Sequence, residues 1–200
     1  MSGAARVLAL AALVVAALIG LGLWGGLVQV TPAPVPATHH LSAGQARAVP
    51  AQRGAMLMVP VAGVGRAALR DDWGEARGGG TRAHHGLDIP AAAGTPVIAA
   101  GPGRIEKLFQ SGNGGTTLYE RSADGTWMYY YAHLAGYAPG VQEGQQVRAG
   151  DPIGYVGDTG DAGAGNYHLH FGLSRVAGRG WWQGEEVDPY PVLAGKPAPR

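Results

Sequence analysis

Glycine occurs so often after about residue 56 that long helices are excluded from this part of the chain. The sequence has 35 glycines and 14 prolines among its 200 residues, and each glycine inside a helix costs roughly 1 kcal/mol relative to alanine. No stretch after residue 56 keeps a 3.6-residue apolar repeat over three turns. Short apolar runs instead alternate with turn signals such as Gly112-Asn113-Gly114-Gly115 and Asp124-Gly125, which is typical of strands. We predict a mainly β, antiparallel domain over residues 56–193, a compact sandwich or open barrel.

Apolar runs of four to six residues mark the predicted strands of this domain. They are Val97–Ala100, Arg104–Phe109, Thr116–Glu120, Trp127–Ala132, Ile153–Val156 and His168–Leu173. Side chains alternate between the two faces of a strand, so the aromatic run from Trp127 to Tyr131 should bury one set and expose the other. Exposed aromatic rings can form the wall of a groove. Residues 194–200 are expected to form a C-terminal tail.

An apolar segment near the N-terminus is long enough to cross a membrane. Val7–Val28 has 22 residues without a charge or an amide side chain, which as a helix spans about 33 Å against a hydrocarbon core of ~30 Å. Arg6 precedes it and no Lys or Arg follows before Arg47, so residues 1–6 are predicted to be cytoplasmic and the rest external. We expect a retained transmembrane signal-anchor at 7–30 in the inner membrane. A cleaved signal peptide is the alternative, although its apolar region is normally only ~7–15 residues long.

Composition narrows the classes of partner and of metal site. Residues 31–55 begin with three prolines within five positions, which predicts an extended Pro/Ala-rich linker in which His39 and His40 are solvated. The chain has 15 Lys and Arg against 14 Asp and Glu, a net charge of +1, so nucleic-acid binding driven by bulk charge is excluded. Cysteine is absent, so a transition-metal site must use histidine and carboxylate ligands.

The first histidine motif is His84-His85-Gly86-Leu87-Asp88. On an extended segment His84 and Asp88 share a face but lie about 13 Å apart. Both can reach one ion only if the backbone bends between them, which Gly86 allows. By itself, the motif is also compatible with a strand end that carries a solvated histidine.

Two further motifs contain histidine. In His168-Leu169-His170-Phe171, strand periodicity puts the two imidazoles on one face and the two apolar side chains on the other. Such a pair is a common way to present imidazole to zinc. His133 follows the aromatic strand in Tyr131-Ala132-His133-Leu134, a position that alone is more typical of a structural histidine.

Together the motifs supply the ligand set of a catalytic zinc ion. Neutral imidazoles and one carboxylate leave a fourth position for water, and two His with one Asp keep the site at +1, which favours a lowered pKa of that water. The sequence has no HExxH motif, so the helix-borne glutamate base of that metalloprotease class is missing. The remaining histidines are suitable bases because their ordinary pKa lies near neutral pH.

These residues resemble the M23 family of zinc metallopeptidases, also called the LytM or lysostaphin-type family. The resemblance rests on His-x-Gly-x-Asp at 84–88, Tyr-Ala-His-Leu at 131–134 and His-Leu-His-Phe at 168–171 after a glycine-rich loop that begins at Gly157. Gly94-Thr95-Pro96-Val97 and the closing Val187-Asp188-Pro189 extend it from about residue 59 to Leu193.

The resemblance implies a role for each residue. His84, Asp88 and His170 would ligate one Zn²⁺ per chain. His133 and His168 would face the reacting water and the scissile carbonyl, and the sequence leaves open which of the two is the base. His85 would be a bystander.

The resemblance also implies a function, an endopeptidase that hydrolyses amide bonds in the peptide stems or cross-links of peptidoglycan. An anchor, a spacer and an external domain suit an enzyme fixed in a bacterial cell envelope. Two alternatives remain: a non-catalytic envelope regulator that activates another wall hydrolase, and a metallopeptidase with a protein substrate. Coverage of the zinc site by residues 41–58 or by Arg70–Thr81 is also open.

Overall fold

The computed structural model describes residues 56–178, 180 and 184–196. The predicted cytoplasmic N-terminus, the signal-anchor at 7–30, the linker at 31–55 and the end of the predicted tail lie outside these residues. Among the helices that are described, none has the length and apolar character needed to cross a membrane.

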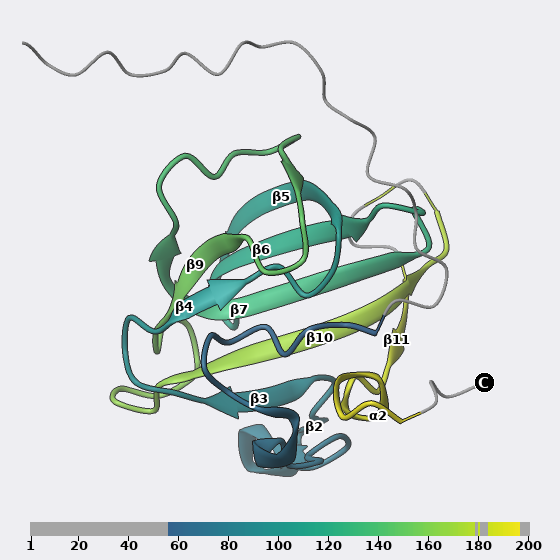
Figure 1. The fold of residues 1–200 in the computed structure, drawn as a ribbon. Coiled ribbons are helices and arrows are strands. Elements are labelled where there is room, and N and C mark those ends of the chain that lie inside the picture. Colours follow the sequence, from purple (N-terminus) through teal and green to yellow (C-terminus); the bar gives the residue numbers. More distant parts are fainter. Residues whose placement is uncertain (1–55, 179, 181–183, 197–200) are drawn as a thin grey trace, which may run out of the picture. The chain divides into compact units, whose positions relative to one another are not determined.

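The described residues form eleven strands, two 3₁₀ helices and one short α-helix (Figure 1). The strands are β1 (Ala76–Arg77), β2 (Arg82–Ala83), β3 (Leu87–Pro90), β4 (Pro96–Ile98), β5 (Gly103–Ser111), β6 (Gly115–Ser122), β7 (Trp127–Tyr137), β8 (Gln146–Val147), β9 (Pro152–Val156), β10 (His168–Val176) and β11 (Gly184–Val187). The helices are η1 (Arg66–Ala68), η2 (Gly78–Gly80) and α2 (Tyr190–Leu193). Each of the six predicted strands coincides with one of the observed strands.

All pairs of described strands are antiparallel, which confirms the predicted mainly β class. β1 and β2 form a separate hairpin, and the others form a nine-stranded sheet with the order β11-β10-β7-β6-β5-β8. β3 also pairs with β10, while β9 joins the end of β7 to β4. The hydrogen bonds thus make one branched sheet. The prediction of a sandwich or an open barrel is confirmed only at the level of its antiparallel strands.

Irregular register lets the long strands change neighbours. In β7 the two residues between Tyr131 and Leu134 lie opposite a single residue of β6, Thr117, so the strand bulges at Ala132 and His133. Beyond the bulge the edge of β7 pairs with β9 in place of β10. Bulges bend a strand and redirect its side chains, and this one lies beside the predicted site.

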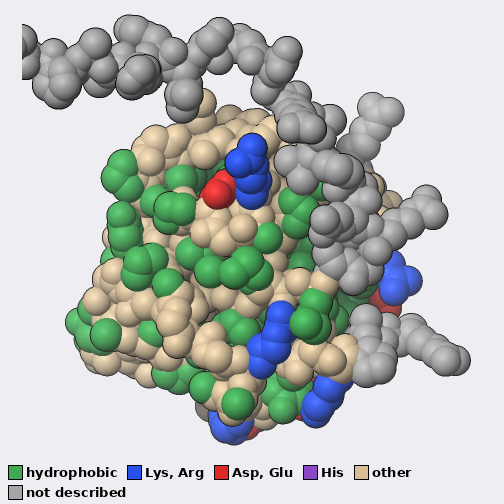
Figure 2. Space-filling view, in the orientation of Figure 1, with side chains coloured by type: hydrophobic (Ala, Val, Ile, Leu, Met, Phe, Trp, Pro, Cys, Tyr) green, Lys and Arg blue, Asp and Glu red, His purple; other side chains and the backbone are tan. Residues whose placement is uncertain are grey.

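The core is built from the apolar faces of these strands. Leu87 and Ile89 of β3 and Leu169 and Phe171 of β10 are almost completely buried, as alternation predicts. Figure 2 shows the molecule in the orientation of Figure 1: hydrophobic and uncharged side chains cover most of this face, a few charged ones are scattered over it, and no histidine of the described residues is in view.

A buried carboxyl group lies inside the core. Glu120 of β6 is completely buried, and Tyr131 donates a hydrogen bond of 2.6 Å to its Oε2. The Tyr131 hydroxyl in turn accepts a bond of 2.9 Å from the backbone N–H of Ala100. The other oxygen, Oε1, has no hydrogen-bond partner in the described part of the chain. Burial raises the pKa of Glu120 to about 8, although the Tyr131 hydrogen bond acts in the opposite direction.

The first prediction is that Glu120→Gln changes how stability depends on pH. Between the ordinary glutamate pKa and the raised one, the folded protein keeps a proton that the unfolded chain has lost, so the wild type loses stability as pH rises, by about 1.4 kcal/mol per pH unit. The glutamine variant lacks this contribution. Thermal unfolding at pH 5, 6, 7 and 8 should therefore show a Tm difference, variant minus wild type, that grows with pH. Glu185→Gln, at an exposed position, should show a constant difference; a constant difference for Glu120→Gln would contradict the prediction.

Candidate metal centre

Two of the predicted ligands face each other across a strand pair. β3 and β10 are antiparallel with Asp88 directly opposite His170, and side chains at opposite positions lie on the same face of a sheet. Because Leu87 and Phe171 fill the core on the other face, Asp88 and His170 must point away from it. Their closest polar atoms, Asp88 Oδ1 and His170 Nδ1, are 3.0 Å apart.

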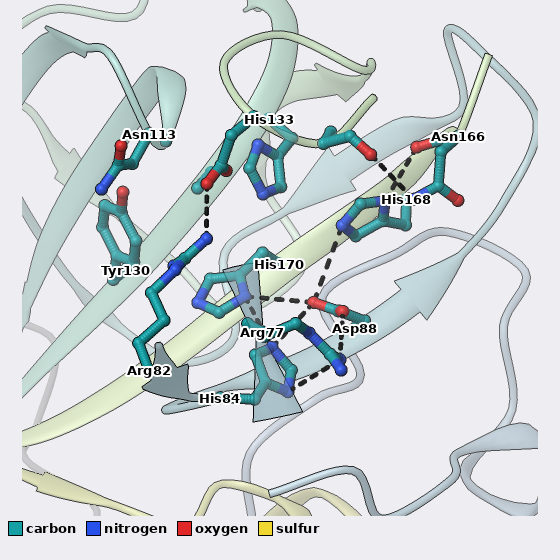
Figure 3. A pocket seen from close by; sticks show the side chains of 14 residues that line it. Arg77, Arg82, His84, Asp88, Asn113, Tyr130, His133, Asn166, His168 and His170 are labelled. Atoms are coloured by element: carbon teal, nitrogen blue, oxygen red, sulfur yellow. Dashed lines mark hydrogen bonds and ion pairs between the residues drawn. The ribbon is translucent and has the colours of Figure 1, made fainter. Parts of the chain in front are cut away.

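The third predicted ligand, His84, reaches the same point from the loop between β2 and β3. Its Nε2 lies 3.0 Å from Asp88 Oδ1 and 2.9 Å from His170 Nδ1. One ligand atom from each of the three residues lies within 4.8 Å of the others. The structure therefore brings His84, Asp88 and His170 together (Figure 3).

Asp72 holds His84 from behind, a contact that the sequence analysis did not foresee. The backbone carbonyl of Asp72 is 3.0 Å from His84 Nδ1, and its side-chain Oδ1 is 3.4 Å away. If Nδ1–H donates to this carbonyl, the lone pair of Nε2 points towards Asp88 and His170. Such support fixes the tautomer and the ring orientation of a metal-ligating histidine.

The two predicted catalytic histidines lie next to this group. His168 Nε2 is 3.7 Å from Asp88 Oδ1, and the rings of His133 and His168 are 4.9 Å apart between centroids. Both Nδ1 atoms contact backbone carbonyls, His133 that of Thr159 at 2.7 Å and His168 that of Asn166 at 2.8 Å. With Nδ1–H donated to these carbonyls, each histidine keeps a free Nε2.

His133 has an unusual backbone conformation at the bulge of β7. Its φ is +60°, and it is the one non-glycine residue with positive φ in the described chain. Residues other than glycine rarely adopt this left-handed region, and strained positions of this kind cluster at functional sites. A hydrogen bond of 2.8 Å from its N–H to the carbonyl of Gly114 helps to hold it there.

A pocket surrounds the five residues. Besides them it is lined by Arg77, Arg82, Asn113, Gly114, Tyr130, Ala132, Asp161, Ala162 and Asn166 (Figure 3). The predicted aromatic alternation holds in part: Tyr129 and Tyr131 are buried and Tyr130 borders the pocket, but Met128, on the face of Tyr130, is buried as well. Arg77 belongs to the segment Arg70–Thr81, so this segment contributes to the wall of the site.

Charges at the site are strongly coupled. Burial alone would raise the pKa of Asp88, but hydrogen bonds from His170 and His84 outweigh it and hold the pKa far below its usual range. Burial would likewise lower the pKa of His84, yet the hydrogen bonds to Asp72 and Asp88 raise it to about 9. Burial lowers the pKa of His133, and the neighbouring His168 and His170 lower it further, although the hydrogen bond to the Thr159 carbonyl acts in the opposite direction.

The donor set fits a divalent transition metal. Two imidazole nitrogens and one carboxylate oxygen are the ligands of many catalytic zinc sites, and the ionised Asp88 supplies the negative charge. Arg77 Nη2 is 3.0 Å from the second oxygen of Asp88, Oδ2, which leaves Oδ1 for a metal ion. A cation at this position would displace the proton of His84, because a ligating imidazole is neutral.

Gly86 is needed for a different reason from the one the sequence suggested. Its φ is not in the left-handed region, so backbone freedom is not the main requirement. A Cβ atom at this position would instead lie 2.4 Å from Cε1 of His170 and 2.9 Å from the carbonyl oxygen of Phe171. The close approach of the His170 ring requires glycine here.

Comparison with known proteins agrees with this geometry. The sequence profile of peptidase family M23 matches residues 82–189, which include all five site residues. The chain belongs to peptidase family M23.

Relatives of this M23 chain include cell-wall peptidases. It is 41% identical over 130 residues to the L-Ala–D-Glu endopeptidase of Bacillus subtilis, an alignment that covers 62% of this chain and 39% of the relative. It is 36% identical over 93 residues to the peptidoglycan DD-endopeptidase ShyC of Vibrio cholerae, with 46% of this chain and 21% of the relative covered. The chain thus spans well under half the length of these relatives.

The M23 fold is also seen in solved structures. The catalytic domain of the antimicrobial peptidase lysostaphin from Staphylococcus simulans superimposes with a TM-score of 0.53 at 31% identity, over 62% of this chain and 90% of that domain. The mainly antiparallel β architecture is therefore that of M23 catalytic domains.

The second prediction concerns Gly86→Ala. The methyl group should displace the His170 ring or the β10 backbone, reducing the free energy of unfolding by on the order of 1–3 kcal/mol and weakening zinc binding. Thermal unfolding and zinc titration against a competing chelator measure the two effects. Gly112→Ala is the matched control, because a Cβ there meets no atom within 4 Å and should change neither quantity. Unaltered zinc affinity in Gly86→Ala would contradict the prediction.

The third prediction distinguishes the two adjacent histidines. His85 lies outside the site, with its ring stacked on Trp73 and its Nδ1 paired with Glu186. His84→Ala should lower zinc affinity by at least about 100-fold, since even residues that merely support a ligand contribute 10- to 100-fold. His85→Ala should retain one zinc per chain, measured by elemental analysis after gel filtration. The reverse pattern would show that the wrong histidine has been assigned.

Proposed function

We propose that this M23 chain is a zinc-dependent endopeptidase that hydrolyses amide bonds in the peptide stems or cross-links of peptidoglycan. The observation that carries the proposal is the convergence of His84, Asp88 and His170 beside the free Nε2 atoms of His133 and His168 in one pocket. The first three are the proposed metal ligands, and the other two are the proposed catalytic residues.

In this proposal the protein holds one zinc ion per chain. Bound there, Zn²⁺ would supply a Lewis acid that lowers the pKa of a water molecule and polarises the scissile carbonyl. The ligand oxygen and nitrogens are already held in place, His84 through Asp72 and Asp88 through Arg77. This support reduces the rearrangement that metal binding requires.

His133 is suited to accept the proton of the attacking water. Its lowered pKa favours the neutral ring, and its Nδ1 contact with the Thr159 carbonyl leaves Nε2 towards the pocket as a lone-pair acceptor. A general base in this position typically contributes 10²- to 10⁴-fold to a rate.

His168 is suited to the opposite role. Its Nε2 faces the pocket, 3.7 Å from Asp88 Oδ1. From this place a proton on Nε2 can be donated in a hydrogen bond to the oxyanion of the tetrahedral intermediate, or passed to the leaving amine.

The substrate class follows from the relatives and from the polar pocket. One relative is named a peptidoglycan DD-endopeptidase and another an L-Ala–D-Glu endopeptidase, and a pocket between β-strands and loops suits an extended peptide chain. We extend the proposal to location: residues 7–30 anchor the chain in the inner membrane, 1–6 are cytoplasmic, and 31–55 connect the anchor to a peptidase domain at 56–193 in the bacterial envelope. The length and lack of charge of Val7–Val28 support this arrangement.

The fourth prediction tests the activity directly. The full-length protein loaded with zinc is incubated with intact sacculi, and the released muropeptides are identified by mass. Cross-linked or stem peptides should be cleaved, and chelation followed by zinc addition should abolish and then restore cleavage. His133→Ala and His168→Ala should each lower the rate by about 10²- to 10⁴-fold, while His85→Ala should cleave like the wild type.

Intact sacculi in the presence of zinc-loaded, folded protein would overturn the proposal. A protein substrate, or binding to another wall hydrolase without cleavage, would then be the function to test. Retained activity in both histidine variants would instead remove His133 and His168 from the mechanism.

A further inference from the structure

Two arginines border the pocket, but their charges are used differently. Arg77 Nη2 contacts Asp88 Oδ2 at 3.0 Å and Asp72 Oδ2 at 3.4 Å, and its Nη1 lies 3.2 Å from Glu75 Oε2. Three carboxylates therefore surround this guanidinium. The Arg77 guanidinium therefore pairs with carboxylates of the protein itself, and few of its N–H groups remain to bind a ligand.

Arg82 makes a single ion pair with another described residue, Asp161. The arginine belongs to the β1–β2 hairpin, where it pairs with Arg77 in the strand register. Asp161 belongs to the loop between β9 and β10, and its backbone N–H donates to the carbonyl of Asn113 at 2.8 Å. The Arg82 side chain thus extends from one wall of the pocket to the other (Figure 3).

The partners of this ion pair are accessible to solvent. The Arg82 side chain is 50% exposed and that of Asp161 39% exposed. Exposed pairs of this kind stabilise a protein little, because water and salt screen them and ordering two side chains costs entropy. A carboxylate from outside can therefore replace Asp161 at Arg82 at little cost, and the guanidinium can bind it through two parallel N–H···O bonds.

We propose that Arg82 is a specificity residue that binds a free carboxylate on the substrate residue adjoining the cleaved bond, and that Asp161 occupies this position in the free enzyme. The inference rests on the proposed peptidase function. It assigns the substrate class as peptides with an acidic residue next to the scissile amide.

The chemistry of a relative's substrate fits this assignment. The Bacillus subtilis relative is named for an L-Ala–D-Glu bond, in which glutamate follows the cleaved amide. A glutamate has two carboxyl groups, and the continuing peptide can use no more than one, so a free carboxylate remains beside the reaction centre. Arg82 lines the same pocket as the proposed metal ligands and lies two residues from His84, which places it beside that position.

The fifth prediction uses two synthetic peptides that differ only in charge. Both have blocked ends; one contains an L-Ala–D-Glu bond with its free carboxylate, and the other contains D-Gln in place of D-Glu. KM and kcat are measured for the zinc-loaded full-length chain, and affinity is measured separately by calorimetry with the His168→Ala protein as the background. Sacculi serve as the substrate that reports the general peptidase activity.

Arg82→Gln should raise KM for the D-Glu peptide about tenfold, which is the lower end of the effect expected when a hydrogen bond to a charged group is lost. The variant should also lose the preference for D-Glu over D-Gln. The effect should appear in KM rather than kcat. Asp161→Asn frees Arg82 and should lower KM for the D-Glu peptide up to about fivefold. Arg148→Gln is the control, because Arg148 is exposed and does not line the pocket.

If Arg82→Gln changes KM equally for both peptides, or changes it for neither, the assignment of Arg82 is overturned. Cleavage of sacculi by the same variant would show that the proposed peptidase function still holds. A higher KM in Asp161→Asn would also overturn it, because Asp161 would then contact the substrate itself. If sacculi and both peptides resist cleavage, the proposed function fails, and the calorimetric affinities decide the role of Arg82 separately. A tenfold loss of affinity caused by Arg82→Gln for the D-Glu peptide alone supports the proposed role of Arg82. Equal affinities of the two peptides for the protein with Arg82 reject that role.

Discussion

The register between β3 and β10 is the constraint on which the site depends. Placing Asp88 opposite His170 aligns a carboxylate with an imidazole on one face, while Leu87, Ile89, Leu169 and Phe171 fill the core on the other. A slip of one residue would turn the polar side chains inward and the apolar ones outward. The free energy of burying four apolar side chains therefore also fixes the geometry of the candidate metal site.

Backbone carbonyls orient three of the histidines. The Nδ1 atoms of His84, His133 and His168 contact the carbonyls of Asp72, Thr159 and Asn166 respectively. His170 differs, because its Nδ1 faces Asp88 and its other ring edge packs over Gly86. The three carbonyls belong to loops, so loops direct these Nδ1 atoms, while β7 and β10 carry the rings of His133, His168 and His170.

The sequence was sufficient to predict six of the strands, because alternation is local information, but the short strands such as β3 were not predicted. Alternation within His168–Phe171 gives two imidazoles on one face, whereas the grouping of all five site residues was predicted through the resemblance to family M23. Asp72 and Arg77 were missed because their contacts depend on the path of a loop with no regular repeat. Glu120 was read only as part of a strand, since an acidic residue in an alternating run gives no sign that its carboxyl is buried. Gly86 was identified, but the close contact that requires it involves His170, 84 positions further along the chain.

The left-handed conformation of His133 lowers the stability of the fold at a residue that is proposed to take part in catalysis. At φ +60° a glycine would have less strain than a histidine, so the imidazole at this bulge lowers the stability of the fold. The surrounding hydrogen bonds hold His133 in one orientation, so most other conformations of this residue are excluded before a substrate binds. For His133 as the proposed base, this rigidity means that folding, and not substrate binding, bears the entropy cost of ordering the ring.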